Sequence, residues 1–308
     1  MAEDFFTLPS FAKINWFLRV LGKREDDYHE LCTIFQTVSL VDEITFSDCD
    51  EVLLTCNDEN IPTDESNLIV KSANVLREKC SIKNGAKIHL EKNIPSPGGL
   101  GGGSSNAAIA LLGLVKLWNL KIDFEDLVKI GAKLGADVPF FFYGGSCLGT
   151  GKGTNLLPIN DLEEKFLLIV MPDVQVSTRE AFARLNAPRL TNFSAKSILH
   201  LCQSEAEGFD LRQTKLKNDF ETSIFAIEPE VKRVKETLLT CGAIQVSMSG
   251  SGASVFAIFD NKETRQATQK ALENETSWRQ FAVATVSREK YREALEKVSG
   301  CFRLVSKK

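Results

Sequence analysis

A glycine-rich stretch is the feature of this sequence with the clearest chemical meaning. It runs from Pro95 to Asn106, and five of its twelve residues are glycine. Glycine tolerates positive φ angles and lets backbone N–H groups approach a ligand closely. Ser104 or Ser105 can cap a helix that follows, since the first N–H groups of a helix have no internal partner. A loop and a helix N-terminus of this kind predict a site for an anion, most often a phosphate group.

The stretch matches neither of the common phosphate-binding motifs. Gly98 and Gly103 have the spacing of a Walker A loop, but Ser104 stands where that motif requires lysine. The dinucleotide fingerprint Gly-x-Gly-x-x-Gly fails in every register, since Ser104 or Asn106 occupies its last position. A flexible surface loop is the alternative. Five glycines between two ordered elements carry an entropic cost, which favours a function for them.

Lys13 and Asn15 are polar residues within the apolar stretch that runs from Phe11 to Val20. In a strand they share one face, and the opposite face carries Ile14, Trp16 and Leu18. A lysine in a strand is as often a solvated residue as a functional one. This stretch alone leaves both interpretations of Lys13 open.

Two further residues, Asp137 and His29, are candidates for catalysis or binding. Asp137 lies between a predicted helix and the aromatic run 140–143, where Pro139 prevents the helix from continuing. A carboxylate beside four aromatic residues is a candidate functional group, and a helix-capping aspartate is the alternative. His29 follows Tyr28 after a charged turn and is one of three histidines. A lone histidine more often makes a structural hydrogen bond than catalyses a reaction.

The spacing of apolar residues predicts the elements that position these side chains. Alternation over 86–91 predicts a strand before the glycine stretch, and helical spacing from 107 to 118 predicts a helix after it. Periodicity also predicts helices over 67–79 and 124–134. The second glycine-rich stretch, 144–153, contains Lys152 and favours a hairpin rather than a second phosphate loop.

The second half of the chain has a different order of predicted elements: β, α-rich, β, β, α, β, α. Strands are predicted over 166–171, 244–249, 253–259 and 281–286, and helices over 194–226, 229–241, 262–273 and 288–298. This order is compatible with a ferredoxin-like sandwich. The acidic connection at 160–165 is the predicted boundary, with an N-terminal phosphate-loop and catalytic domain over 1–160 and a C-terminal domain over 161–308.

Composition excludes several classes of function. The net charge of -4 over 308 residues argues against a nucleic-acid-binding protein, which usually carries a basic face. The acidic N-terminus, 1–4, lacks the order of a signal peptide, and the apolar run 166–171 is too short to cross a membrane. The sequence contains no Cys-x-x-Cys pair, and this argues against a zinc site. We expect reduced thiols for all eight cysteines, which are Cys32, Cys49, Cys56, Cys80, Cys147, Cys202, Cys241 and Cys301.

Three motifs in order resemble those of the GHMP kinase superfamily, whose phosphate loop contains no Walker lysine. They are 11–15 (Phe-Ala-Lys-Ile-Asn), 95–105 and 246–253 (Val-Ser-Met-Ser-Gly-Ser-Gly-Ala). Finer features resemble one member family over nearly the whole chain, the 4-diphosphocytidyl-2-C-methyl-D-erythritol kinases. These features are Lys-Ile-Asn at 13–15, Asp-Tyr-His at 27–29, Phe-Gln at 35–36 and Gly-Ala-Asp-Val-Pro-Phe at 135–140.

The resemblance implies an α+β, two-domain GHMP kinase fold. An N-terminal S5-like domain and a C-terminal ferredoxin-like domain would enclose the active-site cleft. The implied reaction is ATP-dependent phosphorylation of the substrate's 2-hydroxyl in the non-mevalonate isoprenoid pathway, in the cytoplasm, with ATP and Mg²⁺ as cofactors. The implied partner is a small molecule with a cytidine diphosphate moiety, and no nucleic acid, membrane or protein partner is expected.

The resemblance also implies roles for individual residues. Lys13 and Asp137 would be the catalytic pair, and Asn15 and Thr178 would contact the substrate. The cytidine pocket would be formed by Tyr28, His29, Phe35 and Phe182. The phosphates of ATP would bind to Pro95, Ser96, Pro97, Gly98, Gly99, Leu100, Gly101, Gly102, Gly103, Ser104 and Ser105. Ser104 and Ser105 are candidates to hold Mg²⁺, whose ligands the sequence leaves unknown. Pro97 replaces a glycine usual in the family, and the region of Thr178 matches only in its spacing to Phe182.

Two other functions remain compatible with these motifs. Another GHMP kinase could phosphorylate a plain alcohol, but a pocket without a nucleobase has no need of Tyr28 and Phe182 as stacking planes. A catalytically inactive nucleotide sensor on the same fold should have lost Lys13 or Asp137, and both are present.

Overall fold

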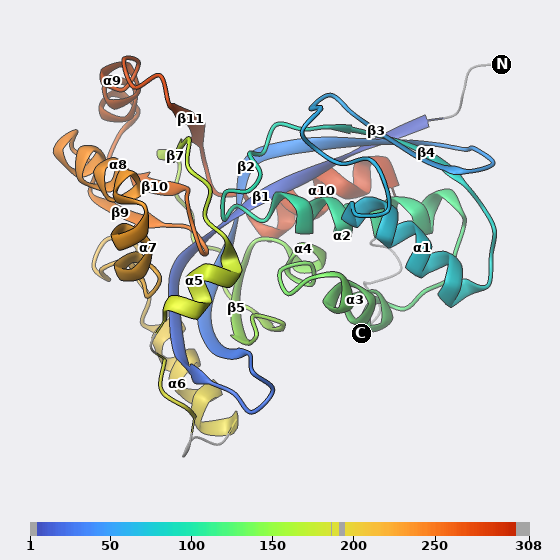
Figure 1. Cartoon of the computed structure of the whole chain (residues 1–308), viewed down its shortest axis with the longest axis horizontal. Helices are drawn as coiled ribbons and strands as arrows, with labels where there is room; N and C mark the ends of the chain where they lie inside the picture. The colour runs from blue at the N-terminus through green and yellow to red at the C-terminus, as the bar shows by residue number, and fades with distance from the viewer. Residues whose placement is uncertain (1–4, 186, 191–194, 300–308) are drawn as a thin grey trace.

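Two β-sheets lie side by side at the centre of the molecule, with helices on their outer faces (Figure 1). The structure is a computed structural model that describes residues 5–185, 187–190 and 195–299. Within these residues the first sheet has seven strands: β1 (Phe5–Lys23), β2 (His29–Ser47), β3 (Val52–Cys56), β4 (Ala86–Glu91), β5 (Ser146–Gly151), β6 (Asn155–Pro158) and β8 (Lys217–Asn218). Its order is β3-β4-β2-β1-β8, and the β5–β6 hairpin branches from β2.

The β1–β2 hairpin is the longest feature of this sheet, with 19 residues in each strand. Strand β1 therefore extends well beyond the predicted 11–20. Its pairing with β2 shifts between Asn15 and Phe17, so Trp16 is an extra residue in the strand. The shift turns Leu18 to the side of Lys13, where it lines a cavity, and the prediction that Leu18 faces away from Lys13 is wrong.

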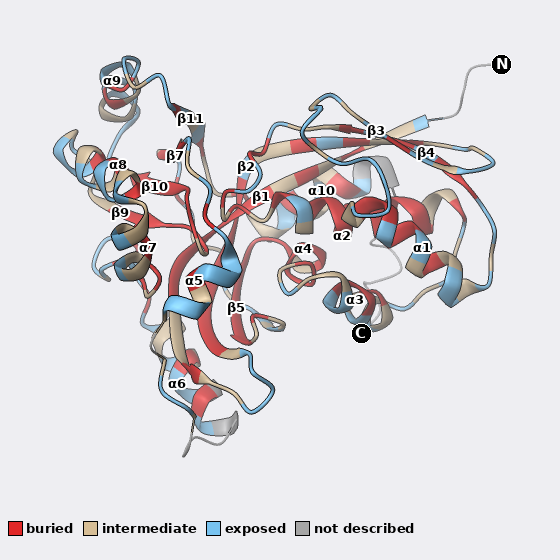
Figure 2. Ribbon diagram, in the orientation of Figure 1, coloured by how far each residue is buried: buried red, intermediate tan, exposed pale blue. Residues whose placement is uncertain are grey.

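Helices pack against one face of the first sheet and form the larger hydrophobic core (Figures 1 and 2). They are α1 (Leu68–Cys80), α2 (Gly102–Leu117), α3 (Phe124–Leu134), α4 (Phe140–Tyr143) and α10 (Arg288–Ser299). The predictions of α1 and α3 are confirmed to within a residue or two. Helix α2 is apolar on nearly all sides because it lies between the sheet and the other helices, and Figure 2 shows it mostly buried.

The second sheet is antiparallel throughout, with the order β11-β7-β10-β9. Within the described residues its strands are β7 (Leu167–Pro172), β9 (Gln245–Met248), β10 (Val255–Ile258) and β11 (Trp278–Val283). Around it lie α5 (Thr178–Arg184), α7 (Glu221–Ile227), α8 (Pro229–Thr240) and α9 (Lys262–Ala271). In chain order the strands stand fourth, first, third and second, as in a ferredoxin-like sandwich, which confirms the predicted architecture of this half.

The continuous helix predicted over 194–226 is wrong in its middle. Residue 194 lies outside the described residues, α6 (Ala195–Glu207) ends well before 226, and α7 begins only at Glu221. Between them β8 pairs in parallel with β1, with Lys217 opposite Phe17. This pairing joins residues far apart in the chain, so no local pattern could reveal it.

The two sheets share a core, and the last helix crosses from one half to the other. Trp16 of β1 meets Phe256 of β10 edge to face, with ring centroids 5.5 Å apart. On α10, Tyr291 is fully buried in the core of the first sheet, where its hydroxyl donates a hydrogen bond to the carbonyl oxygen of Phe141. Residues on both sides of the predicted boundary at 160 thus build the first core, and the boundary itself stays a prediction.

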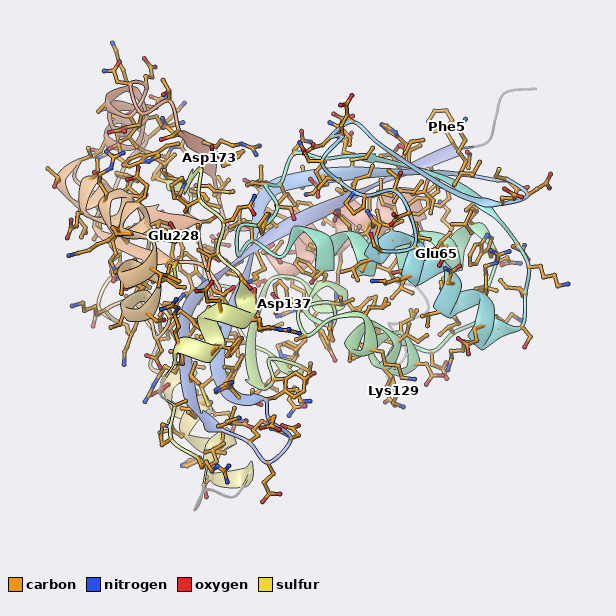
Figure 3. All side chains as sticks on the ribbon, in the orientation of Figure 1. Phe5, Glu65, Lys129, Asp137, Asp173 and Glu228 are labelled. Atoms are coloured by element: carbon orange, nitrogen blue, oxygen red, sulfur yellow. A yellow bond between two sulfur atoms is a disulfide. The ribbon has the colours of Figure 1, made fainter. Side chains whose placement is uncertain are left out.

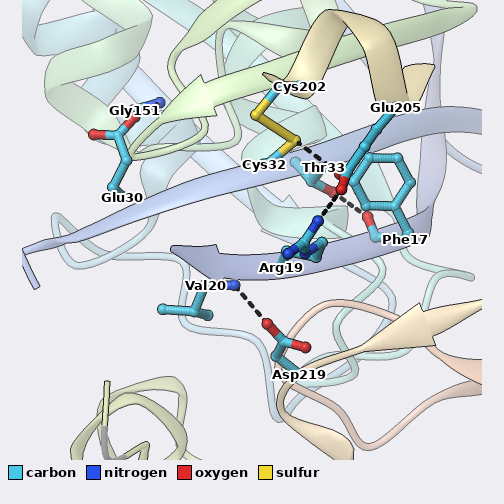
Figure 4. The surroundings of a disulfide bond; sticks show 10 residues. All are labelled: Phe17, Arg19, Val20, Glu30, Cys32, Thr33, Gly151, Cys202, Glu205 and Asp219. Carbon is cyan, nitrogen blue, oxygen red and sulfur yellow. Dashed lines mark hydrogen bonds and ion pairs between the residues drawn. A yellow bond between two sulfur atoms is a disulfide. The ribbon is translucent and has the colours of Figure 1, made fainter. Parts of the chain in front are cut away.

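A disulfide joins Cys32 of β2 to Cys202 of α6, and it holds α6 against the outer side of the β1–β2 hairpin (Figure 4). The Cα atoms of the pair are 5.9 Å apart, within the range that a disulfide spans. Beside it, Arg19 of β1 forms an ion pair with Glu205 of α6. The prediction of reduced thiols is wrong for this pair, and Cys301 lies outside the described residues.

Within the described part of the chain, no helix has both the length and the apolar character that crossing a bilayer requires.

Candidate active site

A cleft of about 390 Å³ opens where the two sheets meet, and most of the residues singled out in the sequence line it. One wall consists of the glycine loop with residues of β1 and β2. The opposite wall consists of α5 and the turn 250–252 between β9 and β10. Asp137 lies at this junction of the two halves (Figure 3). The cleft therefore brings together residues from distant parts of the chain.

Helix α2 begins directly from the glycine loop, and its N-terminus is open. Gly101 is the N-cap residue, with a φ of 70°, and no side chain accepts a capping hydrogen bond. The prediction that Ser104 or Ser105 caps the helix is wrong, because both lie within its first turn. The hydroxyl of Ser105 instead accepts a hydrogen bond from Ser10 at 2.8 Å. The first N–H groups of α2 are left for a ligand, and 102–104 line the cleft.

Both walls of the cleft hold the glycine loop in place. The backbone N–H of Lys13 donates to the carbonyl oxygen of Leu100 at 2.9 Å. On the other side, the Ser249 hydroxyl donates to the carbonyl oxygen of Gly99 at 3.0 Å. A Cβ atom on Gly99 would lie 2.2 Å from the carbonyl oxygen of Ser249, so only glycine allows this approach.

Lys13 and Asp137 face each other across the cleft. Their Nζ and Oδ2 atoms are 3.4 Å apart, and the side chains are 3% and 33% exposed. The Lys13 ammonium also donates to Asn15 Oδ1 at 2.7 Å, and Asn15 Nδ2 donates to Thr33 Oγ1 at 2.8 Å. Because Thr33 donates in turn to the carbonyl oxygen of Phe17, this chain of bonds fixes the orientation of the Asn15 amide.

Asp137 lies in the short turn between α3 and α4, where its carbonyl oxygen accepts a hydrogen bond from the N–H of Phe140. The aromatic residues that follow it do not surround the carboxylate. Phe140, Phe141 and Phe142 are completely buried in the core, and Phe140 stacks on Phe35 with centroids 5.1 Å apart. The aromatic run therefore anchors the turn, and the carboxylate itself points into the cleft.

Two residues of the expected cytidine pocket, Tyr28 and His29, lie at the tip of the β1–β2 hairpin and do not line the cleft, whereas Phe182 of α5 does. The His29 ring stacks on Phe182 of α5, with centroids 5.0 Å apart and an angle of 24° between the ring planes. Tyr28 is 58% exposed beside them. Burial, and then the positive charge of Lys23, lower the pKa of His29 below its ordinary value of 6.5. The imidazole is therefore neutral at physiological pH.

Phe35, the fourth residue of the expected cytidine pocket, and Thr178 lie away from the hairpin tip, and both line the cleft. Phe35 is directly opposite Asn15 in the β1–β2 pairing, and its ring centroid lies 5.7 Å from the Lys13 ammonium. Thr178 lies at the start of α5, where its hydroxyl shares a hydrogen bond of 2.9 Å with Ser251. The structure thus groups Phe35 with the lysine and Thr178 with the turn 250–252, away from the hairpin tip.

Sequence reasoning missed Lys152 as a cleft residue. It lies in the turn of the β5–β6 hairpin and lines the cleft together with Lys13. Its ammonium is 3.5 Å from the centroid of the Tyr28 ring and 3.1 Å from Asp26 Oδ2. The signal in the sequence was a lysine among the glycines of 144–153. The hairpin interpretation treated it as an ordinary turn residue.

A second cavity, of about 920 Å³, is larger than the cleft but separate in its chemistry. It lies between the β5–β6 hairpin and α6, and its lining includes Arg24, Glu30, Leu157 and Ile198. The lining of this cavity contains neither Lys13 nor Asp137, and no residue of the glycine loop. The arrangement of catalytic groups therefore identifies the smaller cleft as the candidate active site.

Comparison with known proteins identifies the family to which the chain belongs. The family model for the GHMP kinases N terminal domain matches residues 67–145, and the GHMP kinases C terminal model matches 204–277. A 4-diphosphocytidyl-2-C-methyl-D-erythritol kinase from Syntrophus aciditrophicus is 38% identical over 89% of this chain and 97% of its own. One from Thermoanaerobacter pseudethanolicus is 40% identical over 83% of this chain and 88% of its own.

Solved structures agree with these relatives. A crystal structure of 4-(cytidine 5'-diphospho)-2C-methyl-D-erythritol kinase superposes with a TM-score of 0.72 at 29% identity, over 91% of this chain and 98% of the other. Homoserine kinase from Cytophaga hutchinsonii shares the fold, with a TM-score of 0.69 at 21% identity, over 93% and 96% of the two chains. The expected two-domain α+β fold is confirmed. The chain belongs to the GHMP kinases and, among them, to the family of 4-diphosphocytidyl-2-C-methyl-D-erythritol kinases.

Proposed function

We propose that the protein transfers the γ-phosphate of ATP to the 2-hydroxyl of 4-diphosphocytidyl-2-C-methyl-D-erythritol, a step in the synthesis of isoprenoid precursors. The relatives that match most of the chain carry the name of this activity. The observation that carries the proposal is the Lys13–Asp137 pair, 3.4 Å apart, in the same cleft as the open N-terminus of α2. Action in the cytoplasm stays a prediction.

Asp137 and Lys13 have complementary roles in this reaction. The Asp137 carboxylate accepts the proton as the 2-hydroxyl oxygen forms its bond to the γ-phosphorus, and ADP leaves as the bond to the β-phosphate oxygen breaks. Lys13 stabilises the negative charge on the transferred phosphoryl group. Asn15 holds the Lys13 ammonium from the side, through its hydrogen bond of 2.7 Å. A direct contact of Asn15 with the substrate stays a prediction.

The glycine loop supplies the phosphate site in this mechanism. Backbone N–H groups at the start of α2 donate to phosphate oxygens, and the positive end of the helix dipole favours the negative charge. Gly99 and Gly101 adopt φ angles of 73° and 70°, which a residue with a side chain rarely adopts. The proposed ATP contacts of 95–104, which line the cleft, rest on this geometry, and a contact of the buried Ser105 stays a prediction.

The groups around the loop fit a magnesium ion that is carried mainly by the nucleotide. Within the described ranges, no set of three or more His, Cys, Asp or Glu side chains could hold a metal by itself. Ser105 is fully buried and bonded to Ser10, whereas Ser104 and Asp137 line the cleft with oxygen atoms that suit Mg²⁺. When bound, the ion would neutralise charge on the β- and γ-phosphates.

The hairpin tip is the proposed site of the cytosine base. Tyr28 and Phe182 would stack on the ring, and stacking alone accepts any base. Selectivity requires groups that match one hydrogen-bonding edge, and the neutral His29 imidazole has one acceptor and one donor. Cytosine presents an amine where uracil presents a carbonyl, so uracil would leave a hydrogen-bonding group of the site unpaired. Lys152, near Tyr28, would supply positive charge for the diphosphate.

An ATP-consumption assay with four acceptors tests the proposal. The acceptors are the cytidylyl substrate, its uridylyl analogue, and the plain alcohols mevalonate and homoserine. We expect kcat/KM to be highest for the cytidylyl substrate. Tyr28→Ala should raise KM for it, since stacking contributes about 1–3 kcal/mol per base, and should leave KM for ATP unchanged. Equal use of cytidylyl and uridylyl substrates would remove the base-reading pocket, and a preference for a plain alcohol would overturn the proposed substrate.

A further inference from the structure

A buried carboxylate lies beneath the glycine loop, outside the cleft. Asp42 of β2 is completely buried, and its two oxygens accept four hydrogen bonds. Oδ1 accepts from the backbone N–H groups of Asn93 and Ile94, each at 2.7 Å. Oδ2 accepts from the Lys92 ammonium at 2.7 Å and from the Asn106 side chain at 2.8 Å. Three of these donors directly precede the glycine-rich stretch, and Asn106 is its last residue.

The four donors come from opposite ends of the loop. Residues 92–94 lead from β4 into Pro95, and Asn106 follows Ser105 in α2. A single carboxylate therefore joins the two ends. We call Asp42, Lys92 and Asn106 the clasp. Five glycines give the intervening backbone many conformations, and fixing both ends reduces their number.

Stability alone gives little reason for this arrangement. Burying an ion pair carries a desolvation cost that often equals or exceeds the attraction between the charges. Burial accordingly lowers the pKa of Lys92, although the charge of Asp42 acts to raise it. Apolar residues could replace the ion pair itself with comparable stability, although they would leave the N–H groups of Asn93 and Ile94 without an acceptor. The polar groups are explained if the geometry they impose on the loop is useful.

We propose that Asp42 and Lys92 are positioning residues that hold the glycine loop in the conformation that binds the phosphates of ATP. This inference rests on the proposed function of the loop. Lys92 has a second effect, because its ammonium lies close to Gly102, the first residue of α2. A Cβ atom placed on Gly102 would be 3.0 Å from Lys92 Nζ. The lysine thus neutralises the Asp42 carboxylate next to the helix N-terminus, where an unpaired negative charge would repel phosphate.

The test compares Asp42→Asn, Lys92→Met and the double variant, with ATP affinity measured by calorimetry and both KM values measured by assay. If the loop is competent in only about a tenth of the molecules, the apparent Kd for ATP rises roughly tenfold. KM for ATP should rise with it, while KM for the alcohol substrate stays the same. Because Asp42 and Lys92 act through the same contact, the double variant should bind ATP no more weakly than the single variant with the lower affinity.

Glu164 offers a matched control outside the cleft. Glu164 also accepts two consecutive backbone N–H groups, at 2.9 and 3.1 Å, and pairs with Arg212 at 2.9 Å. It does not line the cleft. Glu164→Gln should lower stability without changing the ratio of the two KM values. If Asp42→Asn does not fold, Asn106→Ala removes a single donor and should raise the Kd for ATP in the same direction by a smaller factor.

The outcomes separate this inference from the proposed function. A wild-type protein that does not bind ATP overturns both. Wild-type binding with unchanged affinity in the folded clasp variants overturns the clasp alone. An equal rise of both KM values, or the same selective rise in Glu164→Gln, would show a general loss of structure and would also overturn it.

Discussion

Lys13 contacts each part of the site that the proposed reaction needs. Its backbone bonds to Leu100 of the glycine loop, and its ammonium lies 3.4 Å from Asp137. Its stem packs so closely on Gly101 that a Cβ there would lie 3.0 Å from Lys13 Cγ. Lys13 thereby sets the spacing between the catalytic base Asp137 and the glycine loop before any substrate binds. Such preorganisation removes the need to reorder the site during the reaction.

The role of Asp137 can be tested with an isosteric change. Asp137→Asn keeps the shape of the side chain but cannot accept the hydroxyl proton. We expect kcat to fall by roughly a hundredfold or more, the usual contribution of a positioned base. The free energy of unfolding and the Kd for ATP should change little, because the side chain is 33% exposed. Glu125→Gln on the surface of α3 is the control, and a kcat within about threefold of wild type would remove Asp137 from the mechanism.

The pH dependence of substrate binding should report on His29. Its folded-state pKa is lowered, so its contribution to stability is complete above the unfolded value of 6.5 and is lost as the pH falls through the lower, folded value. Protonation also removes the one acceptor of the ring. We therefore expect KM for the cytidylyl substrate to stay level above pH 6.5 and to rise as the pH falls further, while KM for ATP does not follow.

The His29→Gln variant provides the comparison, since glutamine has an acceptor that does not titrate in this range. Its KM for the cytidylyl substrate should be nearly independent of pH. An acid rise that persists unchanged in this variant would assign the titration to another group.

At the scale of the elements, the spacing of apolar residues predicted those helices and strands that this spacing itself determines. Helices α1 and α3 carry their own apolar periodicity, and the second half shows the strand order of its sandwich. The start of α2 was missed, because a glycine-rich first turn has no apolar spacing to detect. The pairing of β8 with β1, the extra residue Trp16 and the disulfide between Cys32 and Cys202, 170 residues apart, depend on contacts between distant segments.

The same distinction holds for the candidate site. Lys13, Asp137 and the glycine loop were proposed from motifs, and the structure places them in one cleft. Lys152 and Asp42 have no motif of their own, because their partners come from other elements. Residue type and spacing identify the groups that react or bind, whereas the groups that position them become visible only in three dimensions.

The first turn of α2 offers a test of the phosphate site at the level of the element. At Gly103 an added Cβ would meet only one atom within 4 Å, a methyl group of Leu68 at 4.0 Å, so the position is open toward the cleft. Gly103→Val should therefore fold normally and place its side chain where a phosphate would lie. We expect the Kd for ATP in calorimetry to rise by at least roughly tenfold, about 1.4 kcal/mol.

Gly102→Ala is the matched comparison, one residue earlier in the same turn. A Cβ there would lie 3.0 Å from Ile94 Cγ2 and 3.0 Å from Lys92 Nζ, so this change should lower the melting temperature. If Gly103→Val binds ATP as tightly as wild type, the phosphates lie elsewhere.

At the scale of the whole molecule, the chain folds back on itself to complete its first core. Tyr291 and Leu295 of α10 are buried against residues of the first sheet and of α4. These residues come from the end of the described chain, and the partners come from its beginning and middle. The two halves should therefore unfold together rather than as independent domains.

The hydrogen bond of Tyr291 provides a measurable part of this coupling. Tyr291→Phe leaves the buried carbonyl oxygen of Phe141 without its donor and should lower the free energy of unfolding by about 1 kcal/mol. Urea denaturation followed by both fluorescence and circular dichroism should show one shared transition at a lower midpoint. Tyr143→Phe, at a partly buried tyrosine, is the control. Two separated transitions in the wild-type protein would contradict the coupling.

The long β1–β2 hairpin also limits how the enzyme can move during turnover. Residues of β1 enter three hydrophobic cores. Leu8 lies in the core of the first sheet and its helices, Trp16 in the core that the two sheets share, and Leu18 in the core of the second sheet with α7 and α8. A rigid-body rotation of one half against the other would have to bend both strands and break the shared packing. Opening for product release should instead come from short peripheral segments, namely the hairpin tip, the β5–β6 turn and α5. The rate at which the phosphorylated cytidylyl product departs would then depend on three short segments and not on one large hinge.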